Sequence, residues 1–301
     1  MACVLKGDIQ ASYSDHRVYM GKFGTVALHF YFTGAHAFDQ DSLNRLRTQL
    51  VGLATPWSYR LRDGLEDAQD PTTAARLYKT FEGSFPDSYE ELIPPEDAII
   101  DVVELDAMLN QEQMRFTLVP SGFNDAQVYL RIYSREAVQL TALLPVVHDL
   151  GVVVVDQATF ELALHDGRRA VVSSLRIERG EHDALAQGET LVEALDAVFT
   201  GLVRSDLFNR LLLAASLTWK EVDLIRAYFY FARQTGQTFA PEAVQKVLLL
   251  HNDFAALLIE LFRLRFEPED ARSADTQAKA WQAKLADAEH YLDGVKAFDE
   301  D

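Results

Sequence analysis

The sequence predicts an α+β protein whose antiparallel sheets carry helices on one face, followed by an all-α helical bundle. Three observations predict this class. Residues 114–203 alternate between β-branched or aromatic runs and helical periodicity, in the order strand, strand, helix, strand, strand, helix. Residues 56–109 show helical periodicity with many acidic side chains. After Arg204 no strand pattern occurs, and apolar residues recur at helical spacing.

The first segment, residues 1–55, predicts a strand followed by a helix. The run TVALHFYF, from Thr25 to Phe32, is β-branched and aromatic and stands between glycines, which is typical of a buried strand. Residues 39–52 then carry leucines at helical spacing, with acidic and serine capping candidates before them and a glycine after them. This strand-to-helix unit is interpreted as a partial α+β module.

Residues 56–112 predict a segment of short, acidic helices. Five prolines stand where they open helices, because the missing N–H of proline is no loss in the first helical turn. They are Pro56, Pro71, Pro86, Pro94 and Pro95. The carboxylates of this segment are interpreted as a solvated helix face rather than as paired catalytic acids. They are Glu90, Glu91, Glu96, Asp97, Asp101 and Glu104.

Residues 113–204 predict an α+β domain. Strands over 114–119 and 126–134 flank the turn-rich PSGFND, as in a hairpin. A helix is expected over 135–151, which Pro145 should kink or restart, since proline removes a backbone hydrogen bond. The remaining elements are strands over 152–164 and 168–179, joined by a turn at His165, Asp166 and Gly167, and a helix over 189–203.

Residues 205–301 predict the helical bundle. One helix starts sharply, because Thr218 and Glu221 have the spacing of a capping box. Apolar and aromatic residues then cover almost its whole circumference, so this helix is expected to run through the centre of the bundle. The last helix, within residues 271–298, has few large apolar side chains and is expected to pack on one side only, or against something outside the chain.

Three arginines in the helical part, Arg210, Arg226 and Arg233, allow two interpretations. Their stems lie along apolar surface while the guanidinium groups reach water or pair with carboxylates. Alternatively, they form inter-domain contacts or an anion site. Their spacing leaves both interpretations open.

Charge and cysteine content limit the partners. The formal charge of −18 disfavours nucleic acid and anionic membrane surfaces, because both require clustered Lys and Arg. The single cysteine, Cys3, excludes an internal disulfide, and the eight histidines show no metal-ligand spacing. The first twenty residues lack the apolar core of a signal peptide, so a cytoplasmic location is expected.

Several long blocks carry a family resemblance. FNRLLLAASLTWKEVDLIRAYFYFARQ and FAPEAVQKVLLLHNDFAALLIELFRLRFEP are similar to the helical segment of the large bacterial NAD-specific glutamate dehydrogenases. FEGSFPDSYEELIPPEDAIIDVVELDAML and VYLRIYSREAVQLTALLPVVHDLGVVVVDQATFELAL resemble the preceding region of that family, where ACT-type modules alternate with helical pieces. The resemblance runs from about residue 25 to the last residue, and it implies ACT-like sheets for residues 113–204 and a partial ACT-like module for residues 1–55.

The resemblance also implies where the chemistry belongs. In this family a separate catalytic core, with a catalytic lysine and a dinucleotide-binding βαβ unit, oxidises L-glutamate to 2-oxoglutarate with NAD. The chain shows no G-x-G-x-x-G after a strand, so we expect no catalytic, cofactor-binding or metal-binding residue in it, and NAD only in the parent enzyme. The expected partners are the catalytic dehydrogenase domain, in cis or in trans, and further copies in a homo-oligomer.

One corner of the α+β domain is a candidate ligand site by the same resemblance. In ACT modules the ligand meets the loop between the first strand and the first helix, where a helix N-terminus can hold a carboxylate. This places a possible amino-acid effector at Tyr133, Ser134 and Arg135, although YSREAV lacks the proline-glycine turn of ligand-binding members. Two functions stay open: a regulatory and assembly region of the dehydrogenase, or a stand-alone ACT-type amino-acid sensor or protein-interaction module.

Overall fold

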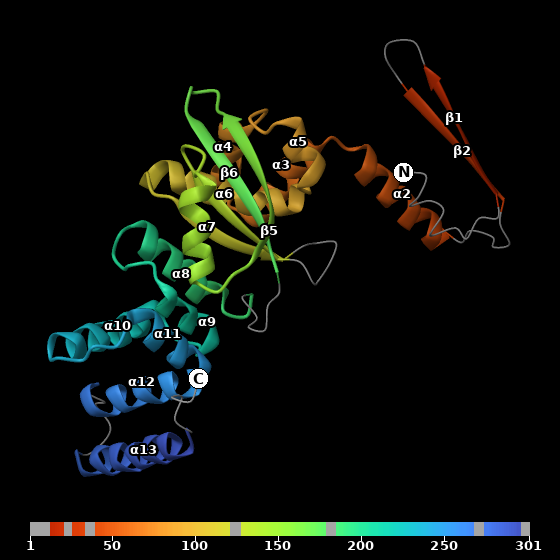
Figure 1. Ribbon diagram of the computed structural model, residues 1–301. Helices are drawn as coiled ribbons and strands as arrows, with labels where there is room; N and C mark the ends of the chain where they lie inside the picture. The colour runs from red at the N-terminus through yellow and green to blue at the C-terminus, as the bar shows by residue number, and fades with distance from the viewer. Residues whose placement is uncertain are drawn as a thin grey trace. The chain divides into compact units, whose positions relative to one another are not determined.

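The computed structural model describes residues 13–20, 26–33, 40–120, 128–178, 185–267 and 274–295. The chain divides into two compact units. Figure 1 shows the helices and strands along the chain. The first unit comprises residues 1–83 and 90–100, and the second comprises residues 84–89 and 101–301. Residues 121–125 of the predicted PSGFND turn and Cys3 fall outside the described residues.

The first unit begins with a two-stranded antiparallel sheet. Strand β1 (Tyr13–Met20) pairs with β2 (Val26–Thr33), so that Tyr13 lies opposite Thr33. Helix α2 (Gln40–Ala54) follows. The predicted strand and helix of this segment are thus present, and β1 is an additional strand that the sequence analysis did not predict.

Short helices follow, with proline at or just before the first residue of each. They are α3 (Trp57–Ala68), α4 (Pro71–Phe81), α5 (Asp87–Leu92) and α6 (Pro95–Gln111). Asp70 caps α4, since its carboxylate accepts the backbone N–H groups of Thr72 and Thr73 at 3.1 Å each. The second half of α6, from Asp101 onward, belongs to the second unit.

The second unit contains a four-stranded antiparallel sheet in the order β3-β4-β6-β5. Its elements along the chain are β3 (Arg115–Pro120), β4 (Val128–Ser134), α7 (Leu140–Asp149), β5 (Val154–Ala163), β6 (Arg169–Ile177) and α8 (Gly188–Phe199). Helix α7 joins β4 to β5, and β6 lies between these two strands and is antiparallel to both, which is a split β-α-β arrangement. The predicted order of elements and the α+β fold class are confirmed.

Pro145 does not divide the helix that contains it. Helix α7 runs unbroken from Leu140 to Asp149, so the expected restart is wrong. The helix also begins later than predicted, and Pro145, its sixth residue, removes the single backbone bond that an N–H at this position would make to the carbonyl of Thr141. Gly151, with φ of 83°, follows the end of α7 as expected.

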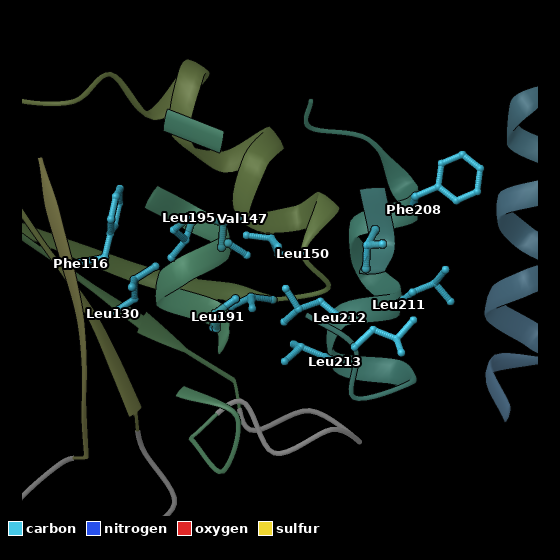
Figure 2. Packing of buried hydrophobic residues seen from close by; sticks show 14 of the residues in the cluster. Phe116, Leu130, Val147, Leu150, Leu191, Leu195, Phe208, Leu211, Leu212 and Leu213 are labelled. Carbon is cyan, nitrogen blue, oxygen red and sulfur yellow. The ribbon is translucent and has the colours of Figure 1, made fainter. Parts of the chain in front are cut away.

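Both faces of the sheet are covered. On one face, Leu130 of β4 packs in a common core with Val147 of α7 and with Leu191 and Leu195 of α8 (Figure 2). On the other face, side chains of β4 contact Asp101 of α6. The sequence analysis expected helices on one face, and the structure adds the second half of α6 to the other.

The helical part packs onto the same core. Its elements are the 3-10 helix η2 (Leu207–Arg210), α9 (Leu211–Ala214), α10 (Trp219–Gln234), α11 (Pro241–Leu250), α12 (Asn252–Phe266) and α13 (Ala274–Gly294). Phe208, Leu211, Leu212 and Leu213 extend the core of the sheet into the helices (Figure 2). The domain boundaries near residues 55, 112 and 204 stay predictions.

Helix α10 begins as predicted but packs differently. The hydroxyl of Thr218 accepts the N–H of Glu221, and the Glu221 carboxylate accepts the N–H of Thr218 at 2.8 Å, so the capping box is confirmed. The expected central position is wrong, because Tyr228 is 53% exposed and Phe231 is 63% exposed. Only one face of the helix is buried, and the aromatic residues lie on both faces.

Candidate functional site

The predicted ligand corner lies at the end of β4, and its three side chains lie in different surroundings. Tyr133 is fully buried and donates its hydroxyl to Oδ1 of Asp101 at 2.7 Å. The Ser134 hydroxyl donates to the backbone carbonyl of Glu136 at 2.7 Å. Arg135 is half exposed and pairs with Glu112 at 2.7 Å. The structure therefore does not bring these three groups together around one ligand position.

Tyr133 belongs instead to a buried polar cluster, which we call the Asp101 cluster and define as Tyr89, Asp101, Arg131 and Tyr133. The Asp101 carboxylate accepts from Nη1 of Arg131 at 2.7 Å, from Tyr133, and from the hydroxyl of Tyr89. Asp101 is 0% exposed and Arg131 is 2% exposed. The interpretation of Asp101 as part of a solvated acidic face is therefore wrong, since it sits on the side of α6 that covers the sheet.

Burial controls the ionisation of the Asp101 cluster. Burial, followed by the nearby negative charge of Asp101, raises the pKa values of Tyr89 and Tyr133 well above their usual range. Burial also raises the pKa of Asp101, while Arg131 and the two phenols oppose that rise. The phenols stay protonated at neutral pH and donate to the carboxylate, so the cluster ties α6 to the sheet.

A cleft of about 690 Å³ opens beside the predicted corner. Its walls come from the end of α6, the segment after β4, and the turn between β5 and β6. Charged side chains of both signs line it: Arg135, Glu136, Glu161, Arg168 and Arg169. Sequence reasoning found the residue at position 135 but missed those of the β5–β6 turn, because only the sheet register brings that turn to this end of β4.

Arg226 is the centre of a second buried polar cluster, the Arg226 cluster of Asp206, Asn209, Asp223 and Arg226. Its guanidinium forms a two-point contact with Asp206, at 2.9 Å from Nε and 3.0 Å from Nη2. It also donates to Asp223 and to the side-chain oxygen of Asn209, at 2.6 Å each. Arg226 is 4% exposed, and the carboxylates of Asp206 and of the half-exposed Asp223 neutralise its charge. The contact with Asp206, the N-cap of η2, fixes α10 to η2.

The other two arginines differ from Arg226. Arg210 Nη2 lies 2.9 Å from Nε2 of His148, in the last turn of α7. Arg233 is exposed and lines an apolar groove among α10, α11, α12 and α13. The pairing interpretation therefore describes Arg226, whereas a role for Arg210 and Arg233 in contacts beyond this unit stays a prediction.

Neither metal ligation nor membrane insertion is indicated by the part of the chain that the structure describes. In these residues no group of three or more His, Cys, Asp or Glu side chains is arranged to hold a metal ion. Likewise, no described helix combines the length and apolar character needed to cross a membrane.

The fold and these clusters define a class: an ACT-like α+β region with helical motifs before and after it. Three segments match protein-family descriptions from glutamate dehydrogenase. Residues 65–108 match its helical motif 2, residues 113–190 its ACT3 domain, and residues 203–268 its helical motif 3. The resemblance found in the sequence is confirmed: these three segments are similar to the ACT3 domain and to two helical motifs of glutamate dehydrogenase.

Individual relatives agree with this assignment. The chain is 28% identical over 257 residues to the NAD-specific glutamate dehydrogenase of Mycobacterium tuberculosis, covering 80% of this chain and 16% of the relative. It is 25% identical over 280 residues to the Halomonas elongata enzyme of the same name, covering 87% and 17%. The Pseudomonas aeruginosa enzyme of that name is 26% identical over 266 residues, covering 85% and 16%. The chain thus spans only 16–17% of the length of these relatives.

Proposed function

We propose that this chain is a non-catalytic regulatory and assembly region of an NAD-dependent glutamate dehydrogenase in the cytoplasm. A dehydrogenase domain, in cis or in trans, would convert L-glutamate and NAD to 2-oxoglutarate, ammonium and NADH. One observation carries the proposal: helical motif 2, the ACT3 domain and helical motif 3 follow one another along 65–268. NAD would bind the dehydrogenase domain and not these residues.

The geometry supports a structural role. Arg131 of the Asp101 cluster and Arg226 of the Arg226 cluster are both buried, and each pairs with a carboxylate of its own cluster. Buried ion pairs of this kind connect helices to their neighbours. Such connections fix the helices relative to the elements that they contact, which suits a region that helps to assemble a larger enzyme.

An activity assay tests the proposal. The purified chain, mixed with L-glutamate and NAD, should form no NADH above the rate without protein. Added to a polypeptide that carries the dehydrogenase core, it should co-sediment with that polypeptide and change its kinetics. Turnover by the clean chain alone would contradict the non-catalytic assignment, and failure to associate would contradict the assembly role.

The charged cleft favours a second candidate, an ACT-type amino-acid sensor. Arginine and glutamate side chains on one cleft present partners for both the carboxylate and the ammonium of a free amino acid. Titration calorimetry with single amino acids should then give saturable heat, and Arg169→Gln should abolish it. Arg47→Gln, on the exposed surface of α2, is the matched control and should leave the heat unchanged.

A further inference from the structure

A groove of about 720 Å³ lies among the last four helices of the chain. We call it the helical groove, and its main lining residues are Leu224, Tyr228, Leu258, Phe262, Phe266 and Trp281. Several apolar side chains along it face solvent, including Phe266, which is 60% exposed, and Phe239, which is 64% exposed. Contiguous exposed apolar and aromatic surface of this kind is typical of an interaction site.

The walls of the helical groove are two helical stripes. On α10 the lining residues recur from Leu224 to Arg233, and on α12 they recur from Leu258 to Phe266. At a rise of 1.5 Å per residue, each stripe is about 12–14 Å long. Tyr228 and Phe262 meet edge to face where the two helices approach, with ring centroids 6.3 Å apart. Two helical ridges of this length leave a trough that fits two to three turns of a third helix.

The charged side chains that line the helical groove are both positive. Arg233 and Arg265 are its charged lining residues, although the chain as a whole carries −18. Within the part of the chain that the structure describes, neither guanidinium forms an ion pair with a carboxylate. The guanidinium carbon of Arg265 lies over the Trp281 ring, 5.1 Å from its centre, which is a cation–π contact. The groove therefore presents apolar walls with cationic groups ready to meet carboxylates.

We propose that the helical groove binds an amphipathic helix with acidic residues beside its apolar face, supplied by the polypeptide that carries the dehydrogenase domain. The inference rests on the proposed assembly role and names its contact surface. A second copy docked through the same groove would place arginines against arginines, which disfavours that occupant. A helix flanked by glutamates fills the apolar trough and neutralises both guanidinium groups.

Peptide binding to the full chain tests this inference. The probe is a fluorescent synthetic helix of about 18 residues, with Leu and Phe at i, i+3, i+4 and i+7 and Glu at the flanking positions. A matched peptide carries Lys in place of every Glu. Fluorescence anisotropy should show that the Glu peptide binds at least about tenfold more tightly than the Lys peptide. The double variant R233E/R265E should reverse this preference.

Substitutions at exposed positions test the groove without disturbing the buried core. Phe266→Asp places a carboxylate in the helical groove and should weaken binding of the Glu peptide about tenfold or more. Leu202→Asp is the matched control, because Leu202 is 71% exposed and does not line the groove. It should bind the Glu peptide as the unchanged chain does.

Each remaining outcome decides against the inference. Equal binding of both peptides, no binding of either, or binding unaffected by R233E/R265E would overturn it. A dimer that dissociates in sedimentation when Phe266→Asp is introduced would also overturn it, because the occupant would then be a second copy. Binding of the fatty acid dodecanoate without binding of the Glu peptide would overturn it as well, because the occupant would then be a small apolar ligand. If the peptide fails and the chain still co-sediments with the dehydrogenase polypeptide, the proposed function stands and only this surface is wrong.

Discussion

Nη1 of Arg131 lies 2.7 Å from Oδ1 of Asp101, and both side chains are buried between α6 and the sheet. A charge pair in such surroundings loses its hydration. Both groups stay charged only where their mutual attraction and hydrogen bonds offset that cost. Helix α6 is therefore attached to the ACT-like sheet by an ionic contact in addition to apolar packing. This contact joins a residue matched to helical motif 2 with one matched to ACT3.

Removing the carboxylate tests that attachment. Asp101→Ala leaves the buried guanidinium of Arg131 without its charge partner, so we expect the free energy of unfolding to fall by about 3–5 kcal/mol. Tyr133→Phe removes one donor and retains the ring, and should cost only about 1 kcal/mol. Urea unfolding followed by circular dichroism measures both. Equal losses in the two variants would show that the charge pair contributes nothing beyond a neutral hydrogen bond.

Alkaline pH should destabilise the protein through Tyr89 and Tyr133. Their pKa values are raised by burial, so in the unfolded chain these phenols lose protons near their ordinary pKa of about 10, while in the folded chain they do not. Above that pH the unfolded state binds fewer protons than the folded state, and stability falls by about 1.4 kcal/mol per pH unit for each tyrosine.

The matched comparison isolates this effect from other groups that titrate at high pH. The double variant Tyr89→Phe, Tyr133→Phe should lose stability less steeply between about pH 10 and 11 than the unchanged chain. The measurement is the urea midpoint at a series of pH values. Parallel slopes for the two proteins would show that these phenols ionise equally well in the folded state.

The order of the helices and strands was predictable from the sequence, because the spacing of apolar residues depends on which side chains each element buries. The alternation in residues 114–203 and the Thr218 capping box are local signals, and both describe the structure correctly. Strand β1 was missed because Asp15 and Arg17 interrupt its apolar pattern, and its pairing with β2 is a contact between segments rather than a local preference.

The candidate site was less predictable, for a geometric reason. Tyr133 and Ser134 are consecutive in β4, and consecutive side chains of a strand point to opposite faces. Adjacent sequence positions therefore do not line one ligand site. The burial of Asp101 was equally hidden, since its helix carries many other carboxylates and only the packing of α6 on Arg131 distinguishes it. No local pattern predicts which acid faces the sheet.

Arg226 offers a test of charge geometry. We expect Arg226→Met to destabilise the chain by about 3–5 kcal/mol, because Asp206 is left without its two-point partner. Arg226→Lys should recover little, since an ammonium does not reproduce the planar guanidinium fork. Arg233→Met is the matched control on the same helix and should change stability by less than about 0.5 kcal/mol, because Arg233 is exposed. Thermal unfolding of the three variants gives the ranking, and full recovery by lysine would contradict the role assigned to the fork.

Two phenylalanines of α10 that lie two residues apart are on different faces of the helix, so their substitution should change the free energy of unfolding by very different amounts. Phe229 is 9% exposed and packs 5.5 Å from the ring of Phe208, so Phe229→Ala should cost about 3–5 kcal/mol through lost burial and an unfilled cavity. Phe231 is 63% exposed, and Phe231→Ala should leave stability within about 0.5 kcal/mol. Chemical denaturation of the two variants distinguishes this one-sided packing from a helix buried on all sides. In a centrally buried helix both substitutions would be severe, and a large loss for Phe231→Ala would restore that alternative.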